Sequence, residues 1–220
     1  MRAGPSGLRQ PARPFVLRAA HLDGQRFEAG GEFHFDLHWF DIEHPAREQL
    51  TAAFAELARE GLGKGRRKVE LIRADSEALG LDLNPGSKKV SQVRLQFVTP
   101  TELKSGNEIA ERPEFEILAA RIRDRISTLR ALYGGRPLEL DFRAFSQRAA
   151  SIEMTRCEIA WVETARRSTR TGQVHPLGGF VGEVEYAGEL RGYMPYLAAA
   201  QWTGVGRQTS WGKGLVRVSG

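Results

Sequence analysis

Cysteine is almost absent from the sequence, since Cys157 is the only one among 220 residues. A single thiol cannot form a disulfide within the chain, and it cannot build a cysteine-based zinc site. Such low cysteine usage fits the reducing cytosol. We therefore expect a cytoplasmic protein.

Long apolar runs are lacking as well. No stretch reaches the roughly 20 apolar residues that a transmembrane helix requires. The first residues, MRAGPSGLRQPARPF, contain arginine but no apolar stretch behind it, which argues against a secretory signal. Residues 1–14 are rich in Pro, Gly and Arg, and we expect them to form a disordered lead-in.

A strong excess of one charge is also missing. Lys and Arg number 32 and Asp and Glu 27, a net charge of +5, and hydrophobic residues make up 41% of the chain. The hydrophobic fraction is sufficient for a core. The mild positive balance favours a polyanionic partner, and it is equally compatible with an ordinary basic cytosolic protein.

The first part of the chain predicts one short strand followed by strand, helix and strand. Residues 15–19 (FVLRA) form the short strand. Apolar and polar residues alternate over 31–40 (GEFHFDLHWF), which indicates a half-buried strand. Residues 45–60 have apolar residues at helical spacing, and Pro45 suits the first turn of that helix. Residues 66–74 (RRKVELIRA) predict the next strand.

The remaining chain predicts six elements in the order strand, helix, strand, strand, helix, strand. The expected ranges are 90–100, 113–135, 150–167, 175–188, 188–204 and 214–218. This order is the βαββαβ unit of a ferredoxin-like domain. A polar segment with the turn signal Asn84-Pro85-Gly86 precedes it and indicates a linker.

We therefore predict an α+β protein built from tandem ferredoxin-like (RRM-like) domains, of which the N-terminal one is incomplete. Its strand–helix–strand pattern resembles the latter part of the same unit. The expected boundaries are 1–14 for the lead-in, 15–75 for the partial N-terminal domain, 76–89 for the linker and 90–220 for the C-terminal domain.

A glycine-rich basic segment, TGVGRQTSWGKG, separates the last expected helix from the last expected strand. It carries Gly204, Gly206, Gly212 and Gly214, with Arg207 and Lys213 beside them. Residues 60–68 (EGLGKGRRK) repeat the same order of helix, G-x-G, basic residues and basic strand. We call residues 61–65 the first glycine loop and residues 203–214 the second glycine loop.

Neither loop matches a nucleotide-binding motif. Phosphate loops precede a helix, whereas these loops follow one, and GxxxxGK[ST] is absent from both. We therefore expect no nucleotide cofactor. Exposed backbone N–H groups with cations nearby suit a phosphate backbone that approaches closely. The alternative is that the glycines only make tight turns.

The segment from His175 to Val218 resembles the C-terminal signature of the CRISPR-associated RAMP endoribonucleases that process precursor crRNA, the sixth Cas family. That signature has a GG-h-x-G strand, a Y-x-G-x-L turn, a P-h-L helix and a closing G-h-G-x(5)-G-h-G loop, where h is apolar. The matching residues here are Gly178, Gly179, Gly182, Tyr186, Gly188, Leu190, Pro195, Leu197, Gly204, Gly206, Gly212 and Gly214. Residues 93–108 and 27–71 resemble further parts of the family, so the resemblance extends from about Phe15 onward.

The resemblance implies that the chain binds CRISPR repeat RNA and cleaves it without a metal or other cofactor. The 2′-OH of a ribose attacks the adjacent phosphate, and the products carry a 2′,3′-cyclic phosphate and a 5′-OH. This chemistry needs a base for the 2′-OH, an acid for the leaving oxygen and cations for the charged phosphorane. The implied partners are repeat RNA, crRNA and other Cas effector subunits.

The chain departs from the family at its start. Members usually have a further strand, helix and strand before the point that matches Phe15, and their usual catalytic histidine lies there. Only about a dozen residues precede Phe15 here. Two explanations remain open, a minimal variant or a fragment.

Histidine is the natural candidate for the base and the acid, because its pKa lies near neutrality. We single out His175 and His34 as catalytic candidates. His175 begins a strand whose following helix leads into the second glycine loop, so both should lie at the same end of the domain. His34 stands in the same relation to the first glycine loop. His34 and His38 also flank Asp36 on one strand face, which indicates either a ligand set or, more simply, a polar sheet face.

Basic clusters adjoin the glycine loops. Together with the second glycine loop they form the expected RNA-binding set, which supplies cations to phosphates. Its members are Lys64, Arg66, Arg67, Arg166, Arg167, Arg170, Gly204, Gly206, Arg207, Gly212, Lys213 and Gly214. The alternative for each charge run is a solvated face. Trp202 and Trp211 flank the second glycine loop, and either could stack on a base or belong to the core.

The resemblance thus implies a metal-independent endoribonuclease that processes precursor crRNA. A non-catalytic RAMP-type subunit that holds crRNA in an effector complex is the alternative, because it would share the fold and the loop. A generic ferredoxin-like RNA-binding protein is a third possibility. The third leaves the duplicated glycine loops unexplained, and no RNP-type aromatic motif is visible.

Overall fold

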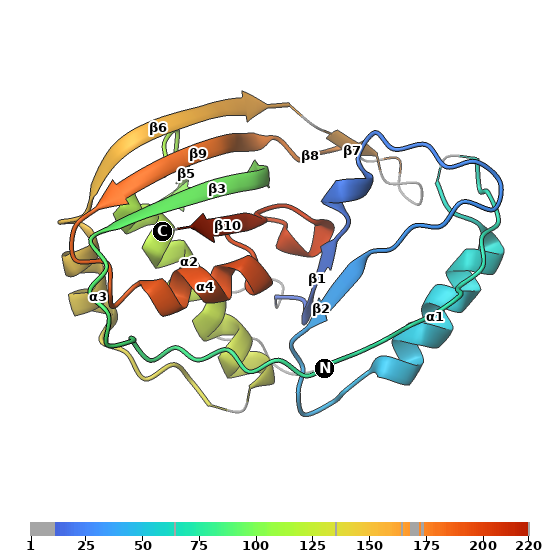
Figure 1. Ribbon diagram of the computed structural model, residues 1–220, viewed down its shortest axis with the longest axis horizontal. Helices are drawn as coiled ribbons and strands as arrows, with labels where there is room; N and C mark the ends of the chain where they lie inside the picture. Colours follow the sequence, from blue (N-terminus) through green and yellow to red (C-terminus); the bar gives the residue numbers. More distant parts are fainter. Residues whose placement is uncertain are drawn as a thin grey trace.

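The computed structural model describes residues 12–219, except 64, 135, 164, 168–171 and 173. Its largest element is a four-stranded antiparallel sheet in the order β10-β3-β9-β6 (Figure 1). The strands are β3 (Gln92–Thr101), β6 (Glu153–Val162), β9 (Gly179–Ala187) and β10 (Val216–Ser219). Two helices, α2 (Phe115–Tyr133) and α4 (Met194–Thr203), cover one face of it.

The connectivity of this sheet is that of a ferredoxin-like domain. The chain runs β3, α2, β6, β9, α4, β10, and the last strand lies beside the first while the third lies between the first and the second. The predicted βαββαβ order is therefore confirmed, and so is the α+β fold class. The predicted domain boundaries stay a prediction.

The core lies between the sheet and its two helices. Every second residue of β3 points into it, among them Leu95 and Phe97, and α2 contributes Leu118 and Ile122 at helical spacing. Burying one such side chain stabilises the fold by about 2 kcal/mol. The buried hydroxyl of Tyr186 donates a hydrogen bond to the carbonyl oxygen of Pro113 at 2.6 Å, so this polar group has a partner inside the core.

The two long predicted strands 150–167 and 175–188 form one hairpin with an interruption. Beyond β6 and β9 it continues as β7 (Ala165–Arg167) and β8 (Val174–Pro176), in the same antiparallel register. Arg166 is the backbone partner of His175 in this extension.

The first part of the chain forms a smaller unit beside the sheet (Figure 1). Strands β1 (Phe15–Arg18) and β2 (Asp36–Trp39) pair antiparallel, with the short 3-10 helix η1 (Ala20–Leu22) between them. Helix α1 (Arg47–Glu60) follows, and the ring of Phe54 packs 5.1 Å from that of Phe35. The strand predicted at 15–19 and the helix predicted at 45–60 are confirmed.

Two strand predictions in this unit need correction. Residues 66–74 form no strand; a single bridge joins Leu62 to Arg67, and the amide of Val69 donates to Ala58 at the end of α1. An alternating segment becomes a strand only when a partner strand offers a ladder, and no described segment does so here. The strand predicted at 31–40 is shorter, because pairing with β1 begins only at Asp36.

Two small elements lie in segments without a prediction. Helix α3 (Phe142–Ala149) is capped by the Asp141 carboxylate, which accepts from the amide of Ala144 at 2.9 Å. Strands β4 (Lys104–Ser105) and β5 (Glu108–Ile109) form a short hairpin. Among the described residues, no helix has both the length and the apolar character needed to cross a membrane.

Candidate nucleic-acid interface

The second glycine loop is fastened to the end of β3. The hydroxyl of Thr99 donates to the carbonyl of Gly212 at 2.9 Å and accepts from the amide of Leu215 at 2.9 Å. The amide of Gly214 donates to Pro100, and that of Arg207 donates to Glu102. The loop therefore has a defined shape, because its backbone is hydrogen-bonded to the Thr99 hydroxyl and to the backbone of Pro100 and Glu102.

Two glycines of this loop are needed because backbone lies against them. A Cβ atom at Gly206 would overlap the carbonyl oxygen of Glu102, and one at Gly214 would overlap the carbonyl oxygen of Val205. Both glycines also have positive φ, +82° and +70°. Their smallness thus serves packing within the protein, so a loss of function on replacing Gly206 by Val would not by itself indicate a lost RNA contact.

The two cations of the loop share one carboxylate. Arg207 pairs with Glu102 through Nη1 and Oε1, and Lys213 Nζ lies 3.6 Å from Glu102 Oε2. Lys213 is only 3% exposed, and Nζ also donates to the carbonyl of Gly178 at 2.7 Å. Burial lowers the pKa of Lys213, and the Glu102 carboxylate acts against that shift. Lys213 therefore holds the loop to the start of β9, while Arg207 keeps a half-exposed side chain.

The C-terminal end of α4, directly before the loop, receives three side-chain donors. Arg18 Nη2 donates to the carbonyls of Gln201 at 3.1 Å and Trp202 at 3.4 Å. His38 Nδ1 lies 2.9 Å from the same Trp202 oxygen, and Arg125 Nε donates to Thr203 at 3.3 Å. Cations are favoured at this end of a helix, where free carbonyls gather.

Arg18 is buried and Arg125 is half-buried at this end of the helix. Neither forms an ion pair with any described residue, and Arg18 Nε, Arg18 Nη1 and Arg125 Nη2 are buried without a hydrogen bond. Burial lowers the pKa of Arg18 to about 10, with Arg125 acting in the same direction. Burial likewise lowers the pKa of Arg125 to about 10, with Tyr133 opposing the shift. Both stay charged at neutral pH, so positive potential gathers beside the loop.

His34, which precedes β2, and His38, which lies in β2, have different surroundings. His34 lies before β2 and stacks on His21, with ring centroids 4.6 Å apart, and His21 Nε2 contacts the His34 carbonyl at 2.8 Å. His38 instead lies at the end of α4, with its ring 5.0 Å from that of Trp202. Among the described contacts, it is His38 that meets the segment leading into the second glycine loop.

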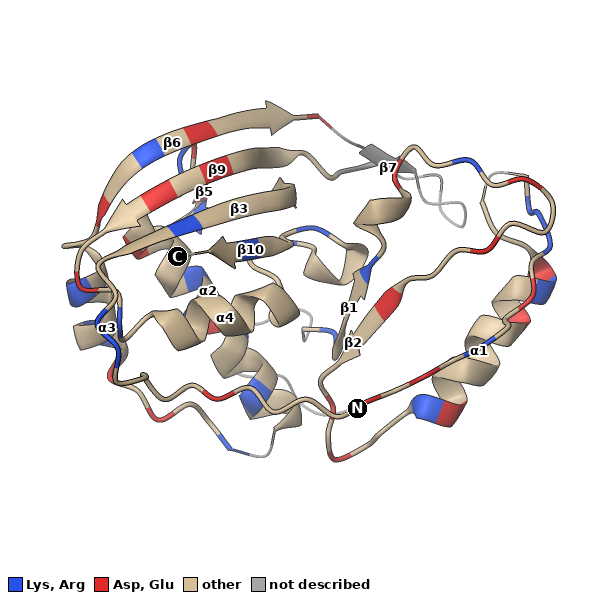
Figure 2. Ribbon diagram, in the orientation of Figure 1, with Lys and Arg blue, Asp and Glu red and all other residues tan. Residues whose placement is uncertain are grey.

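The other predicted residues are placed only in part. The backbone of His175 lies in β8, and the contact of Lys213 with Gly178 shows that the start of β9 adjoins the second glycine loop. The side chains of His175, Arg166 and Arg167 are not described, and Lys64 and Arg170 lie outside the described residues. Arg66 and Arg67 are exposed beyond α1. In Figure 2, blue segments mark basic residues both beyond α1 and on the chain before β10.

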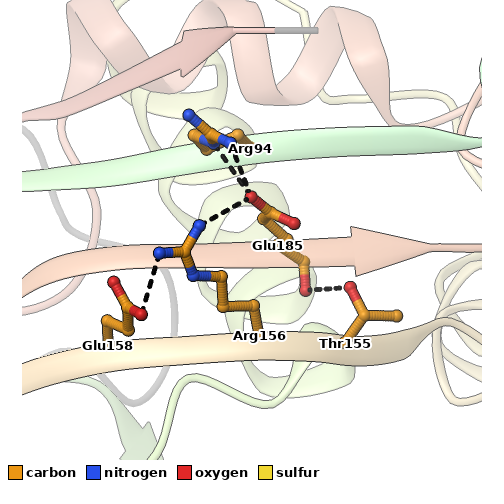
Figure 3. Close-up of polar contacts among 5 residues, drawn as sticks. All are labelled: Arg94, Thr155, Arg156, Glu158 and Glu185. Carbon is orange, nitrogen blue, oxygen red and sulfur yellow. Dashed lines mark hydrogen bonds and ion pairs between the residues drawn. The ribbon is translucent and has the colours of Figure 1, made fainter.

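The open face of the sheet carries charges that neutralise one another. Arg94 Nη2 lies 2.7 Å from Glu185 Oε1, and Arg156 bridges Glu185 at 3.5 Å and Glu158 at 2.8 Å (Figure 3). RNA-binding sheets of the RRM type present aromatic rings on this face. This network of charged side chains offers no such stacking surface. The loops are therefore the better candidates for contact with nucleic acid.

Sequence reasoning missed the importance of Arg18, Arg125 and Glu102. Arg18 could have been noticed because it lies two residues after the fully buried Val16 in a short strand, and therefore on the same inward face. Within the described chain, no group of three or more His, Cys, Asp or Glu side chains is arranged to hold a metal ion.

The fold and the loop define the class: an α+β protein with a ferredoxin-like domain and a glycine-rich loop after its last helix. The family model described as "CRISPR-associated endoribonuclease Cas6" matches residues 95–216. The chain belongs to this family. A second model, described as an N-terminal domain, matches residues 2–96.

Two solved structures show the same fold at low identity. "Cas6 (TTHB231) product complex" aligns over 96% of this chain and 83% of that chain, with TM-score 0.66 and 19% identity. "Cas6 (TTHA0078) product complex" covers 96% and 84%, with TM-score 0.57 and 19% identity. For "Thermus thermophilus Cas6 (TTHB231)" the alignment covers 60% of this chain and only 55% of that chain, with TM-score 0.46 and 18% identity. A comparison with curated protein sequences gives no match.

Proposed function

We propose that this chain binds CRISPR repeat RNA and cleaves it within precursor crRNA. The observation that carries the proposal is the endoribonuclease family match over residues 95–216, because this span contains most of β3, the whole of α4 and the whole second glycine loop. The solved Cas6 proteins of similar fold include product complexes and a substrate mimic complex, which supports the same kind of reaction here.

The proposed reaction is attack of a 2′-OH on its own phosphate, without a metal ion, to give a 2′,3′-cyclic phosphate and a 5′-OH. His175 and His34 are the sequence-derived candidates for base and acid. The position of the second glycine loop beside the start of β9 supports a role for His175 near that loop. The stacking of His34 on His21 gives no such support for His34.

The proposed RNA contacts are the loops and the basic residues around them. Arg66 and Arg67 have exposed side chains, and Arg207 is half exposed, so each can reach a phosphate. Arg166, Arg167, Arg170 and Lys64 belong to the same proposal on the strength of their sequence positions. Buried Lys213 fits the proposal as the residue that shapes the loop. Other Cas subunits are proposed as further partners, in the cytoplasm.

A crRNA-holding subunit without activity is the second candidate. It is favoured by one observation: the described contacts of His34 join it to His21, and none of them joins it to the second glycine loop. Such a subunit would keep the fold, the loop and the cations, and it would not depend on any imidazole.

The test is incubation with the CRISPR repeat RNA in EDTA, beside the same RNA with a single 2′-deoxy at the cut. Cleavage in EDTA that the 2′-deoxy blocks supports the metal-independent enzyme. Cleavage that requires Mg²⁺ contradicts the mechanism. Tight binding of both RNAs without cleavage supports the holding subunit instead.

A further inference from the structure

The C-terminal end of α4 is the place where the histidine-bearing strand β2 reaches the second glycine loop. The contact is a hydrogen bond between His38 Nδ1 and the carbonyl oxygen of Trp202, at 2.9 Å. Trp202 lies two residues before Gly204, the first glycine of the loop. The backbone of α4 therefore holds the His38 imidazole at the start of the loop.

This hydrogen bond fixes which nitrogen of His38 carries the proton. A carbonyl oxygen can only accept, so Nδ1 must be the donor and bear the hydrogen. In the neutral ring Nε2 is then a free acceptor, directed away from α4. No described residue forms a hydrogen bond with Nε2, and the side chain is half-buried. An oriented imidazole with a free lone pair is what general base catalysis requires.

The surroundings of His38 favour an anion. Arg18 lies on the same face of the β1–β2 hairpin as His38. Its Nη2 is close to Gly204, only 3.4 Å from the position that a Cβ atom would take there. Arg125 approaches the same helix end from α2. Neither arginine has an acidic partner among the described residues, although Asp36 is the register partner of Arg18 across the hairpin. The buried charge of Arg18 and the half-buried charge of Arg125, neither with an acidic partner among the described residues, attract a phosphate, and more strongly a phosphorane.

Trp202 adds a surface for a base. Its indole is 39% exposed, and it lies at a tilt of 47° to the His38 ring, with centroids 5.0 Å apart. Unpaired RNA bases stack on aromatic rings of this kind. A nucleotide stacked on Trp202 would carry its ribose and phosphate close to His38 and to Gly204.

We infer that His38 is the general base of the proposed cleavage, at a centre formed by the end of α4, Arg18, Arg125 and the second glycine loop. The inference rests on the proposed function. His38 Nε2 takes the proton of the 2′-OH while the 2′-oxygen bonds to phosphorus. The bond from phosphorus to the 5′-oxygen breaks, the 5′-oxygen takes a proton from water, and His38 returns its proton to solvent.

The decisive variant is His38→Asn. An asparagine amide can still donate to the Trp202 carbonyl in place of Nδ1, but it cannot accept a proton. We expect the single-turnover cleavage rate to fall about a hundredfold or more, while affinity for the 2′-deoxy repeat RNA stays within about twofold. Free imidazole should restore part of the rate to His38→Gly. His44→Asn is the control, because His44 is exposed and pairs with Asp41, and its rate should equal that of the wild type.

The outcomes separate this inference from the proposed function. If the wild type cleaves and His38→Asn cleaves equally well, the inference is wrong and the proposed function stands. If the wild type does not cleave at all, the proposed function fails, and NMR of the labelled histidines with the 2′-deoxy RNA decides where the RNA lies. A His38 ring signal that does not move on binding then overturns the proposed centre, whereas a shift confined to His38 supports it as the RNA site of a holding subunit.

Discussion

The two glycine loops share a sequence pattern and differ in structure. Both follow a helix, and both combine glycines with cations. The second is bound to the end of β3, buries Lys213 and leads into a sheet strand, β10. In the first, Gly63 and Gly65 are exposed, and the basic segment after the loop forms no strand.

The shared pattern of glycines and cations therefore specifies only where a helix ends. The residues packed against the loop determine the structure that the loop adopts. At the second glycine loop, residues 99–102 supply acceptors, donors and a carboxylate. At the first, the described backbone contacts are local, such as that between Leu62 and Arg67. We therefore expect the second loop to be sensitive to substitution in its packing. The first, apart from Gly61, whose added Cβ would overlap the carbonyl oxygen of Arg66, should be sensitive in its surface charge.

The largest effect should come from Gly214→Ala, compared with Gly63→Ala. The two glycines have almost the same backbone angle, φ +70° and +71°, but a Cβ at Gly63 meets open space. The backbone strain alone should cost Gly63→Ala about 1 kcal/mol of unfolding free energy. Gly214→Ala adds the overlap with Val205 and should lose more than about 4 kcal/mol, or fail to fold. Urea unfolding measures both, and equal losses would remove the distinction between the loops.

Removing Glu102 should have the next largest effect. Glu102→Ala leaves the buried Lys213 ammonium without its carboxylate, so we expect a loss of about 3 kcal/mol in unfolding free energy. Adding Lys213→Met should restore part of it, because the unpaired charge is then gone. Glu56→Ala is the control beside the first loop. Its exposed pair with Arg59 should contribute less than about 1 kcal/mol. A double variant less stable than Glu102→Ala alone would contradict this account of Lys213.

The smallest effect on folding, and a clear one on binding, should come from Arg66→Ala with Arg67→Ala. Both side chains are exposed, so stability should change by less than about 0.5 kcal/mol. If both contact phosphates of single-stranded RNA, the slope of log affinity against log salt should decrease by about 1.4. Arg59→Ala with Arg73→Ala is the control, because it changes the net charge equally. Both of these arginines pair with carboxylates, so the slope of log affinity against log salt should equal that of the wild type. Equal slopes in the two double variants would assign the exposed cations to solvent.

The sequence predicts the C-terminal domain well because its elements are long and strongly periodic. β3 and α2 lie close to the ranges expected from alternation and helical spacing, and α4 ends as expected but begins only at Met194, not at residue 188. It fails at residues 66–74, where alternation is present but a ladder partner is not. It also leaves α3 without a prediction, although Asp141 as N-cap and Phe142, Phe145 and Ala149 at helical spacing were available signals.

The candidate site could be predicted only in outline. Glycines and cations point to the second loop, but no local pattern tells that Lys213 turns inward to Gly178 or that Arg18 reaches α4. These contacts join residues far apart in the chain. For the same reason His34 and His38, four residues apart, were expected to share a face, whereas only His38 meets α4.

The hydroxyl of Thr99 has a consequence for how the loop opens. It joins residues 113 positions apart in the chain, and the amide of Val98 donates to Leu215 beside it. The amides of Val98, Gly214 and Leu215 should therefore exchange their hydrogens with solvent together, as one cooperative unit of β3, β10 and the loop. If β10 separates from β3, the loop loses its hydrogen bonds at the same moment. Hydrogen exchange on this short strand therefore reports how often the loop end of the domain is intact.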